Sequence, residues 1–114
     1  MRIRTSETQG VVIANGAALS GAIDFSAYSG MSILIPAVWT SAAIGFYVCD
    51  TVDGTFYPLY DDEGTLVEAT VAVDTKVAVP VTVFPERFVK LWSENAGADE
   101  NQGAERSISV TLKA

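Results

Sequence analysis

Ser107-Ile108-Ser109-Val110-Thr111-Leu112-Lys113 alternates polar and apolar side chains at every step. This period of two is typical of a β-strand with one buried and one solvent-facing side. Further alternating segments or dense apolar runs lie at 11–13, 22–25, 31–35, 44–48, 56–60, 67–73, 77–83 and 88–92. No segment of helical length repeats apolar residues at the helical spacing, and turn signals such as Asp53-Gly54 separate the runs. The sequence predicts an all-β fold, an antiparallel β-sandwich or barrel of about eight strands.

The 114 residues suit one domain, so we expect a single domain over residues 1–114. Residues 1–10 are too polar for a core, and we expect an extended N-terminal arm there. Residues 93–105 are polar and rich in small side chains, which predicts a long flexible loop with room for one helical turn. Both segments are expected to fray in an isolated domain and to become ordered against a partner.

Composition excludes several classes of function. Apolar residues make up 49% of the chain, which indicates a folded protein, and the net charge of −7 disfavours binding to nucleic acid. The chain has no histidine, which removes the commonest general base and any histidine-based metal site. Its one cysteine, Cys49, allows no internal disulfide. We expect a protein that is not an enzyme and that uses no cofactor.

The longest uncharged stretch, residues 25–49, raises the question of a membrane span. Gly30, Pro36 and several hydroxyl residues interrupt it, and no lysine or arginine flanks it. Two successive strands explain the stretch better, so we expect no contact with a membrane. The N-terminus has basic residues but no apolar run after them, so we expect no secretory signal.

Five carboxylates fall in two turns that flank one short strand. They are Asp50, Asp53, Asp61, Asp62 and Glu63. If the turns converged at one end of the fold, these oxygens could bind calcium, although their spacing does not match the calcium-loop pattern. Aspartate is also a good turn residue because its side chain bonds the local backbone. We therefore expect no metal site and keep these five residues as weak calcium candidates.

The aromatic residues offer a second candidate site. Trp39 and Trp92, with the phenylalanines and tyrosines around them, could form a platform on which a sugar stacks. Most of them sit at strand positions where a small sandwich needs bulky core residues, so packing is the favoured interpretation.

Several stretches of the chain together resemble small β-sandwich virion proteins of tailed bacteriophages. The stretches are 18–25, 35–46, 53–61, 87–93 and 101–108, and their order and spacing carry the resemblance over roughly residues 10–113. The genes of this family lie near structural genes, and the family includes capsid decoration, or cement, proteins. It has no catalytic residues to carry over.

The resemblance implies a capsid decoration protein that binds the outer head shell and stabilises contacts between capsomers. Its partner would be the major capsid protein, and it would form a dimer or trimer on the capsid lattice after assembly in the bacterial host cytoplasm. Two alternatives remain open: a structural component of the phage tail or baseplate, and a carbohydrate-binding β-sandwich module.

Overall fold

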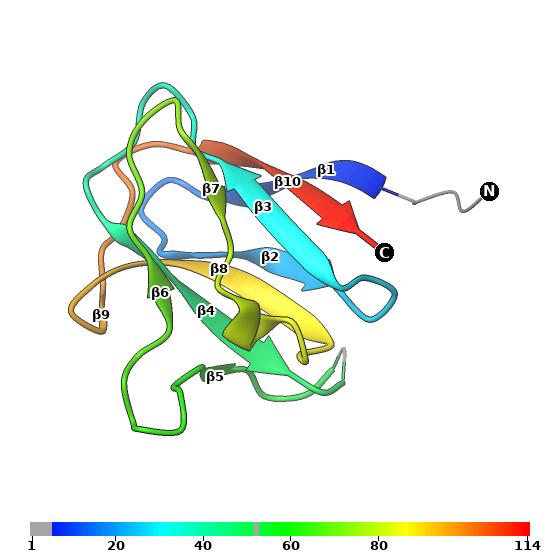
Figure 1. Ribbon diagram of the computed structural model, residues 1–114. Helices are drawn as coiled ribbons and strands as arrows, with labels where there is room; N and C mark the ends of the chain where they lie inside the picture. Colours follow the sequence, from blue (N-terminus) through cyan, green and yellow to red (C-terminus); the bar gives the residue numbers. More distant parts are fainter. Residues whose placement is uncertain (1–5, 52) are drawn as a thin grey trace.

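The computed structural model describes residues 6–51 and 53–114 and confirms the all-β, antiparallel prediction (Figure 1). The strands are β1 (Ser6–Ile13), β2 (Leu19–Asp24), β3 (Gly30–Leu34), β4 (Ala43–Cys49), β5 (Tyr57–Pro58), β6 (Glu68–Ala69), β7 (Lys76–Ala78), β8 (Phe88–Asn95), β9 (Ala98–Asp99) and β10 (Arg106–Lys113). Within the described residues, the only helix is the single 3-10 turn η1 (Val81–Val83). No helix there is long and apolar enough to cross a membrane.

The strands form two layers of one curled sheet, in the order β5-β4-β8-β2-β1-β10-β3-β7. Figure 1 shows β1, β10, β3 and β7 in the upper layer and β2, β8, β4 and β5 in the lower layer. The layers are joined where β1 pairs with β2 at Ile13 and Ser20, so the sheet bends there into a half-barrel. The short strands β6 and β9 extend the lower layer by pairing with β4 and β8.

Alternating apolar side chains from both layers fill the space between them. Ile108, Val110 and Leu112 of β10 are fully buried, as the period of two predicts. They share one core with buried residues of β2, β3, β4 and β8, in which Phe25 and Phe46 are the largest side chains. This core holds both layers at a fixed separation and makes the outer faces of the sheet rigid.

The strand predicted over 77–83 is wrong in its second half. β7 ends at Ala78, and Pro80 leads into η1, in which Val83 is buried and Val81 is 74% exposed. Proline has no N–H to donate to a sheet, so pairing stops near it. The strands predicted over 56–60 and 67–73 also shorten, to two residues each in β5 and β6.

The extended arm predicted for residues 1–10 is wrong for its described part. Ser6–Gly10 belong to β1 and pair with β10 in register, from Ser6 opposite Lys113 to Gly10 opposite Ser109. A polar segment can form a strand when a neighbouring strand supplies the backbone hydrogen bonds. The remainder of the predicted arm, residues 1–5, lies outside the described residues.

The flexible loop predicted for residues 93–105 is also wrong. β8 continues to Asn95, and a tight turn at Ala96 and Gly97, with φ of 52° and 81°, reverses the chain into β9. Ser93, Glu94 and Gln102 are all buried although they are polar. This segment is therefore part of the lower layer and of the packing beneath it.

Gln102 ties this segment to the rest of the fold. Its side-chain Oε1 accepts the backbone N–H of Thr40 at 2.8 Å and the Nε–H of Arg106 at 3.0 Å. Its Nε2 donates to the Thr40 carbonyl at 3.1 Å and to the Ser93 hydroxyl at 2.8 Å. The four bonds satisfy the buried amide completely and join β8 and β10 to the loop after β3.

We expect Gln102→Ala to lower the free energy of unfolding by about 2–4 kcal/mol, because it removes the partner of the half-buried Thr40 backbone N–H and carbonyl and one of the two hydrogen bonds of the Ser93 hydroxyl. Urea denaturation followed by tryptophan fluorescence measures the change. The exposed neighbour provides the control, and Asn101→Ala should stay within about 0.5 kcal/mol of wild type. Equal stabilities for the two variants would contradict the anchoring role of Gln102.

Candidate interaction face

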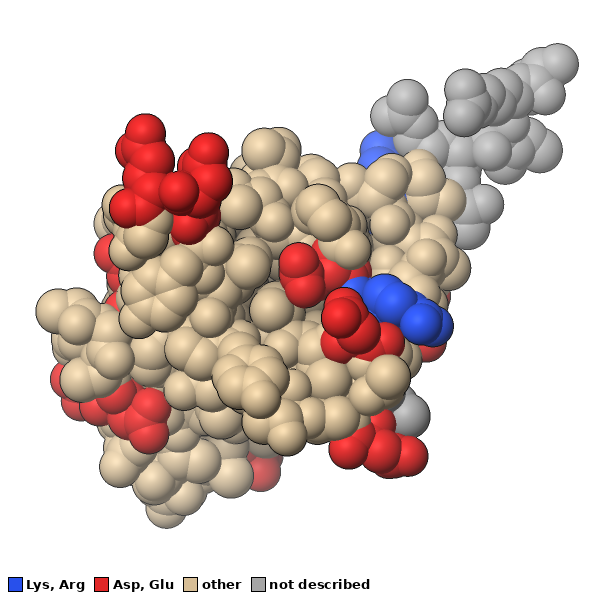
Figure 2. All heavy atoms as spheres, turned by 90° about the horizontal axis from the view of Figure 1, so that it is seen from below, with Lys and Arg blue, Asp and Glu red and all other residues tan. Residues whose placement is uncertain are grey.

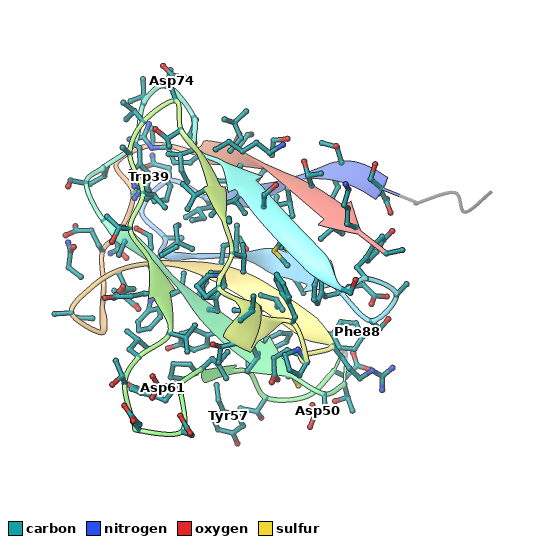
Figure 3. The ribbon with its side chains drawn as sticks, in the orientation of Figure 1. Trp39, Asp50, Tyr57, Asp61, Asp74 and Phe88 are labelled. Carbon is teal, nitrogen blue, oxygen red and sulfur yellow. The ribbon has the colours of Figure 1, made fainter. Side chains whose placement is uncertain are left out.

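The two acidic turns lie at opposite ends of β5 and do not converge. Asp50 follows β4 at one end, while Asp61 follows β5 at the other, and Figure 3 shows the two side chains well apart along the lower edge of the molecule. The two turns therefore do not come together as a shared calcium site would require. Among residues 6–51 and 53–114, no group of three or more Asp, Glu or Cys side chains is placed to hold a metal ion.

Asp61 serves its own turn. Its Oδ1 accepts the backbone N–H groups of Glu63 and Thr65, each at 2.9 Å. The backbone of the same turn is closed by the Gly64 N–H, which donates to the Asp61 carbonyl at 3.1 Å. These bonds are the ordinary turn chemistry of aspartate.

The two tryptophan side chains pack against other residues of the fold and do not form an exposed platform for a ligand. Trp92 is 3% exposed, its Nε1–H donates to Asp99 at 2.8 Å, and its ring meets Tyr47 edge-on at 5.0 Å. The ring also lies over Gly45, where a Cβ would come within 2.7 Å of it. Trp39 is half-buried against the core. A sugar could not stack on Trp92 without opening the lower layer.

Glu94 is a carboxyl group buried on the same lower layer. Its Oε1 accepts the Gly97 N–H at 3.2 Å, while its Oε2 has no hydrogen-bond partner among the residues that the structure describes. Burial, and after it the neighbouring Glu68 carboxyl, raises the pKa of Glu94 to about 7, against the opposing effect of the Gly97 N–H. Glu94 therefore keeps its proton to a higher pH than an exposed glutamate does.

The outward side of the upper layer forms a broad surface of different chemistry, which we call the upper-sheet face. Because successive strand residues point to opposite sides, its members follow directly from the strand register. They are Ser6, Thr8, Gly10, Val12, Gly30, Ser32, Leu34, Lys76, Ala78, Ser107, Ser109, Thr111 and Lys113, all of them exposed or half-buried.

Charge is distributed unevenly between this face and the rest of the molecule. The upper-sheet face carries Lys76 and Lys113 and none of the fourteen acidic residues, although the chain as a whole has a net charge of −7. Figure 2, which views the molecule from below, shows several separate groups of Asp and Glu, one of which lies next to basic atoms. The upper-sheet face itself is therefore weakly basic, although Asp74 lies in the turn beside it at the top of Figure 3, and the lower side carries several acidic groups.

Small hydroxyl residues dominate the upper-sheet face. Thr8, Thr111 and Ser32 lie side by side on β1, β10 and β3. Short side chains of this kind lose little conformational entropy when a protein surface covers them, and no carboxylate has to be desolvated. The face can thus serve as a contact surface for another protein, and the sequence signal for it was the serine and threonine alternation in 107–113.

Comparison with known proteins identifies the fold but not a family. No protein-family model matches the chain, and no curated protein matches its sequence. Among solved structures, the crystal structure of the SPBc2 prophage-derived protein YomS is similar, with a TM-score of 0.66 and 11% sequence identity. The match covers 100% of this chain and 97% of that one. At this identity the similarity shows a shared fold.

We expect the stability of the protein to fall as the pH rises from about 5 to about 7, because folded Glu94 keeps its proton where the unfolded chain has lost it. Below the unfolded pKa the contribution is fully present, and above the folded pKa it is lost. Glu94→Gln should remove about 3 kcal/mol of this dependence and raise Tm at pH 8.

Thermal unfolding between pH 5 and pH 8, followed by circular dichroism, measures this effect. Glu105→Gln removes an exposed carboxyl and is the matched control, which should follow the wild-type pH profile. Parallel profiles for wild type and Glu94→Gln would show that the buried carboxyl does not titrate with folding.

Proposed function

We propose that this chain is a non-enzymatic structural protein of a tailed-phage virion, which decorates the outer head shell and stabilises contacts between capsomers. The observation that carries the proposal is the upper-sheet face: a rigid strand surface without carboxylates on an otherwise acidic molecule. A protein that only binds needs such a surface and no reactive groups. The major capsid protein is the proposed partner.

The dimensions of the upper-sheet face suit a repeated contact. Strands of eight residues such as β1 and β10 are roughly 26 Å long, and four strands side by side are roughly 19 Å wide, which gives at most about 500 Å² of projected area. A typical stable interface buries about 800 Å² on each partner, so one contact would be of modest strength. Repetition over a shell lattice, and a dimer or trimer at a symmetry axis, would supply the remaining affinity.

The acidic lower side fits an outward-facing role. Carboxylates in the turns after β4 and β5 would point away from the shell and would keep neighbouring particles apart by repulsion. The similarity of fold to a prophage-derived protein and the resemblance of the sequence to phage virion proteins are both compatible with this role.

Copy number on the particle tests the proposed location. Quantitative mass spectrometry of purified virions from the source phage should give hundreds of copies per head, at a fixed ratio to the major capsid protein. A few copies per particle would place the protein in the tail or baseplate instead, and absence from the virion would overturn the proposal.

We expect a carboxylate introduced into the upper-sheet face to abolish head binding. The double variant Thr8→Glu/Ser107→Glu places two charges at exposed outward positions, and its occupancy on head shells should fall at least tenfold with little change in Tm. Thr70→Glu, an exposed change outside the face, is the control and should bind like wild type. Unchanged binding of the double variant would show that another surface contacts the shell.

A further inference from the structure

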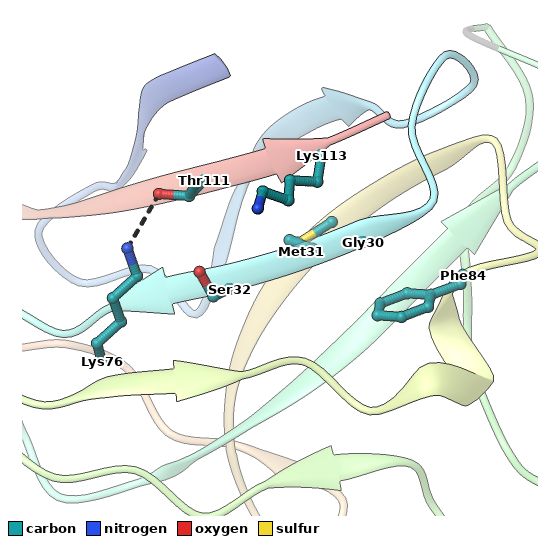
Figure 4. Close-up of a pocket in the computed structure, with 7 residues that line it drawn as sticks. All are labelled: Gly30, Met31, Ser32, Lys76, Phe84, Thr111 and Lys113. Atoms are coloured by element: carbon teal, nitrogen blue, oxygen red, sulfur yellow. Dashed lines mark hydrogen bonds between the residues drawn. The ribbon is translucent and has the colours of Figure 1, made fainter. Parts of the chain in front are cut away.

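A pocket of about 400 Å³ opens at the margin of the upper-sheet face, where β10, β3 and β7 meet the chain after η1. Figure 4 shows Lys76 and Lys113 on opposite sides of β3, with the hydroxyls of Ser32 and Thr111 near them. Met31 and Phe84 supply its apolar lining. The volume is in the range of sites that hold a small ligand or one or two side chains.

The two lysines give this pocket a positive potential. The Lys76 ammonium donates to the Thr111 hydroxyl at 3.3 Å, which holds its charge over the pocket. The Lys113 stem lies beside Gly30, where a Cβ would stand 3.7 Å from the Lys113 Cβ. None of the described residues that line the pocket carries a carboxylate. Both cations are therefore available to an incoming anion.

Two other hollows of similar size have the opposite character. The hollow at the end of β4 is lined by Asp50 and Glu86, and the hollow beside β1 is lined by Glu7 and Asp24. In a molecule with a net charge of −7, an anion approaching these hollows would be repelled, whereas the lysine pocket attracts it.

We propose that the lysine pocket binds a peptide segment that presents a carboxylate next to an aliphatic or aromatic side chain. The carboxylate would accept hydrogen bonds from Lys76 and Lys113, and the apolar side chain would pack against Phe84, which is only partly buried. This segment would be the part of the head shell that contacts the upper-sheet face, so the inference rests on the proposed function. A strongly charged polyanion fits less well, because the acidic residues elsewhere on the molecule would repel it.

The experiment uses the full chain labelled with ¹⁵N and two dipeptides that differ only in charge, N-acetyl-Leu-Glu-amide and N-acetyl-Leu-Gln-amide. Two-dimensional NMR titration should show saturable shifts of the Ser32, Thr111 and Lys113 amides with the glutamate peptide. The glutamine peptide should bind at least tenfold more weakly, because it cannot pair with the ammonium groups. Raising the salt concentration to 0.5 M should weaken the binding of the glutamate peptide.

The double variant Lys76→Gln/Lys113→Gln should lose the response to the glutamate peptide while its spectrum stays that of a folded protein. Arg87→Gln removes an exposed cation outside the pocket and should bind like wild type. Equal binding of both peptides would overturn the proposal, and so would binding of inorganic phosphate that is tighter than binding of the glutamate peptide. Because this titration needs no phage particle, its failure is distinguishable from a failure of head decoration.

Discussion

The strict alternation of side chains along β10 is the constraint on which the rest of this molecule depends. β10 pairs with β1 over eight residues and with β3 over five, so it lies in the interior of the upper layer. Burial of Ile108, Val110 and Leu112 against the lower layer fixes the pairing register. The same register directs Ser109, Thr111 and Lys113 outward. The pairing register of β10 therefore fixes both the buried core and the proposed contact face.

The lower layer uses its outer side differently. There the chain covers the sheet with its own segments, as β6 and the turn into β9 enclose Trp92 and Glu94. The buried Gln102 amide anchors the segment after β9 by four hydrogen bonds, two of them to the backbone of Thr40. One outer side is thus covered by the chain's own segments and acidic at its rim, while the other remains open and carries only two charged residues, an asymmetry that suits the proposed attachment by one face.

The local sequence pattern predicted the strands whose own apolar residues require burial. It failed for segments whose structure depends on pairing with residues far away in the sequence. The strands over 31–35, 44–48, 88–92 and 107–113 were predictable because their apolar residues alone require burial. Ser6–Gly10 form a strand only because β10 offers a complete edge, and residues 93–105 are ordered by partners up to about sixty positions away. The valine alternation in 77–83 indicated a strand, but Pro80 ended the pairing.

The sequence by itself determined the all-β class, the acidic charge and the absence of histidine chemistry, because composition and a period of two are properties of the chain and not of its folding. Only the tertiary structure decided where the charges lie. It separated the two acidic turns to opposite ends of β5 and brought Lys76 and Lys113, distant in sequence, to one carboxylate-free pocket. The physical reason is that strand neighbours in a curled sheet are chosen by the burial of a shared core, and sequence spacing does not encode that choice.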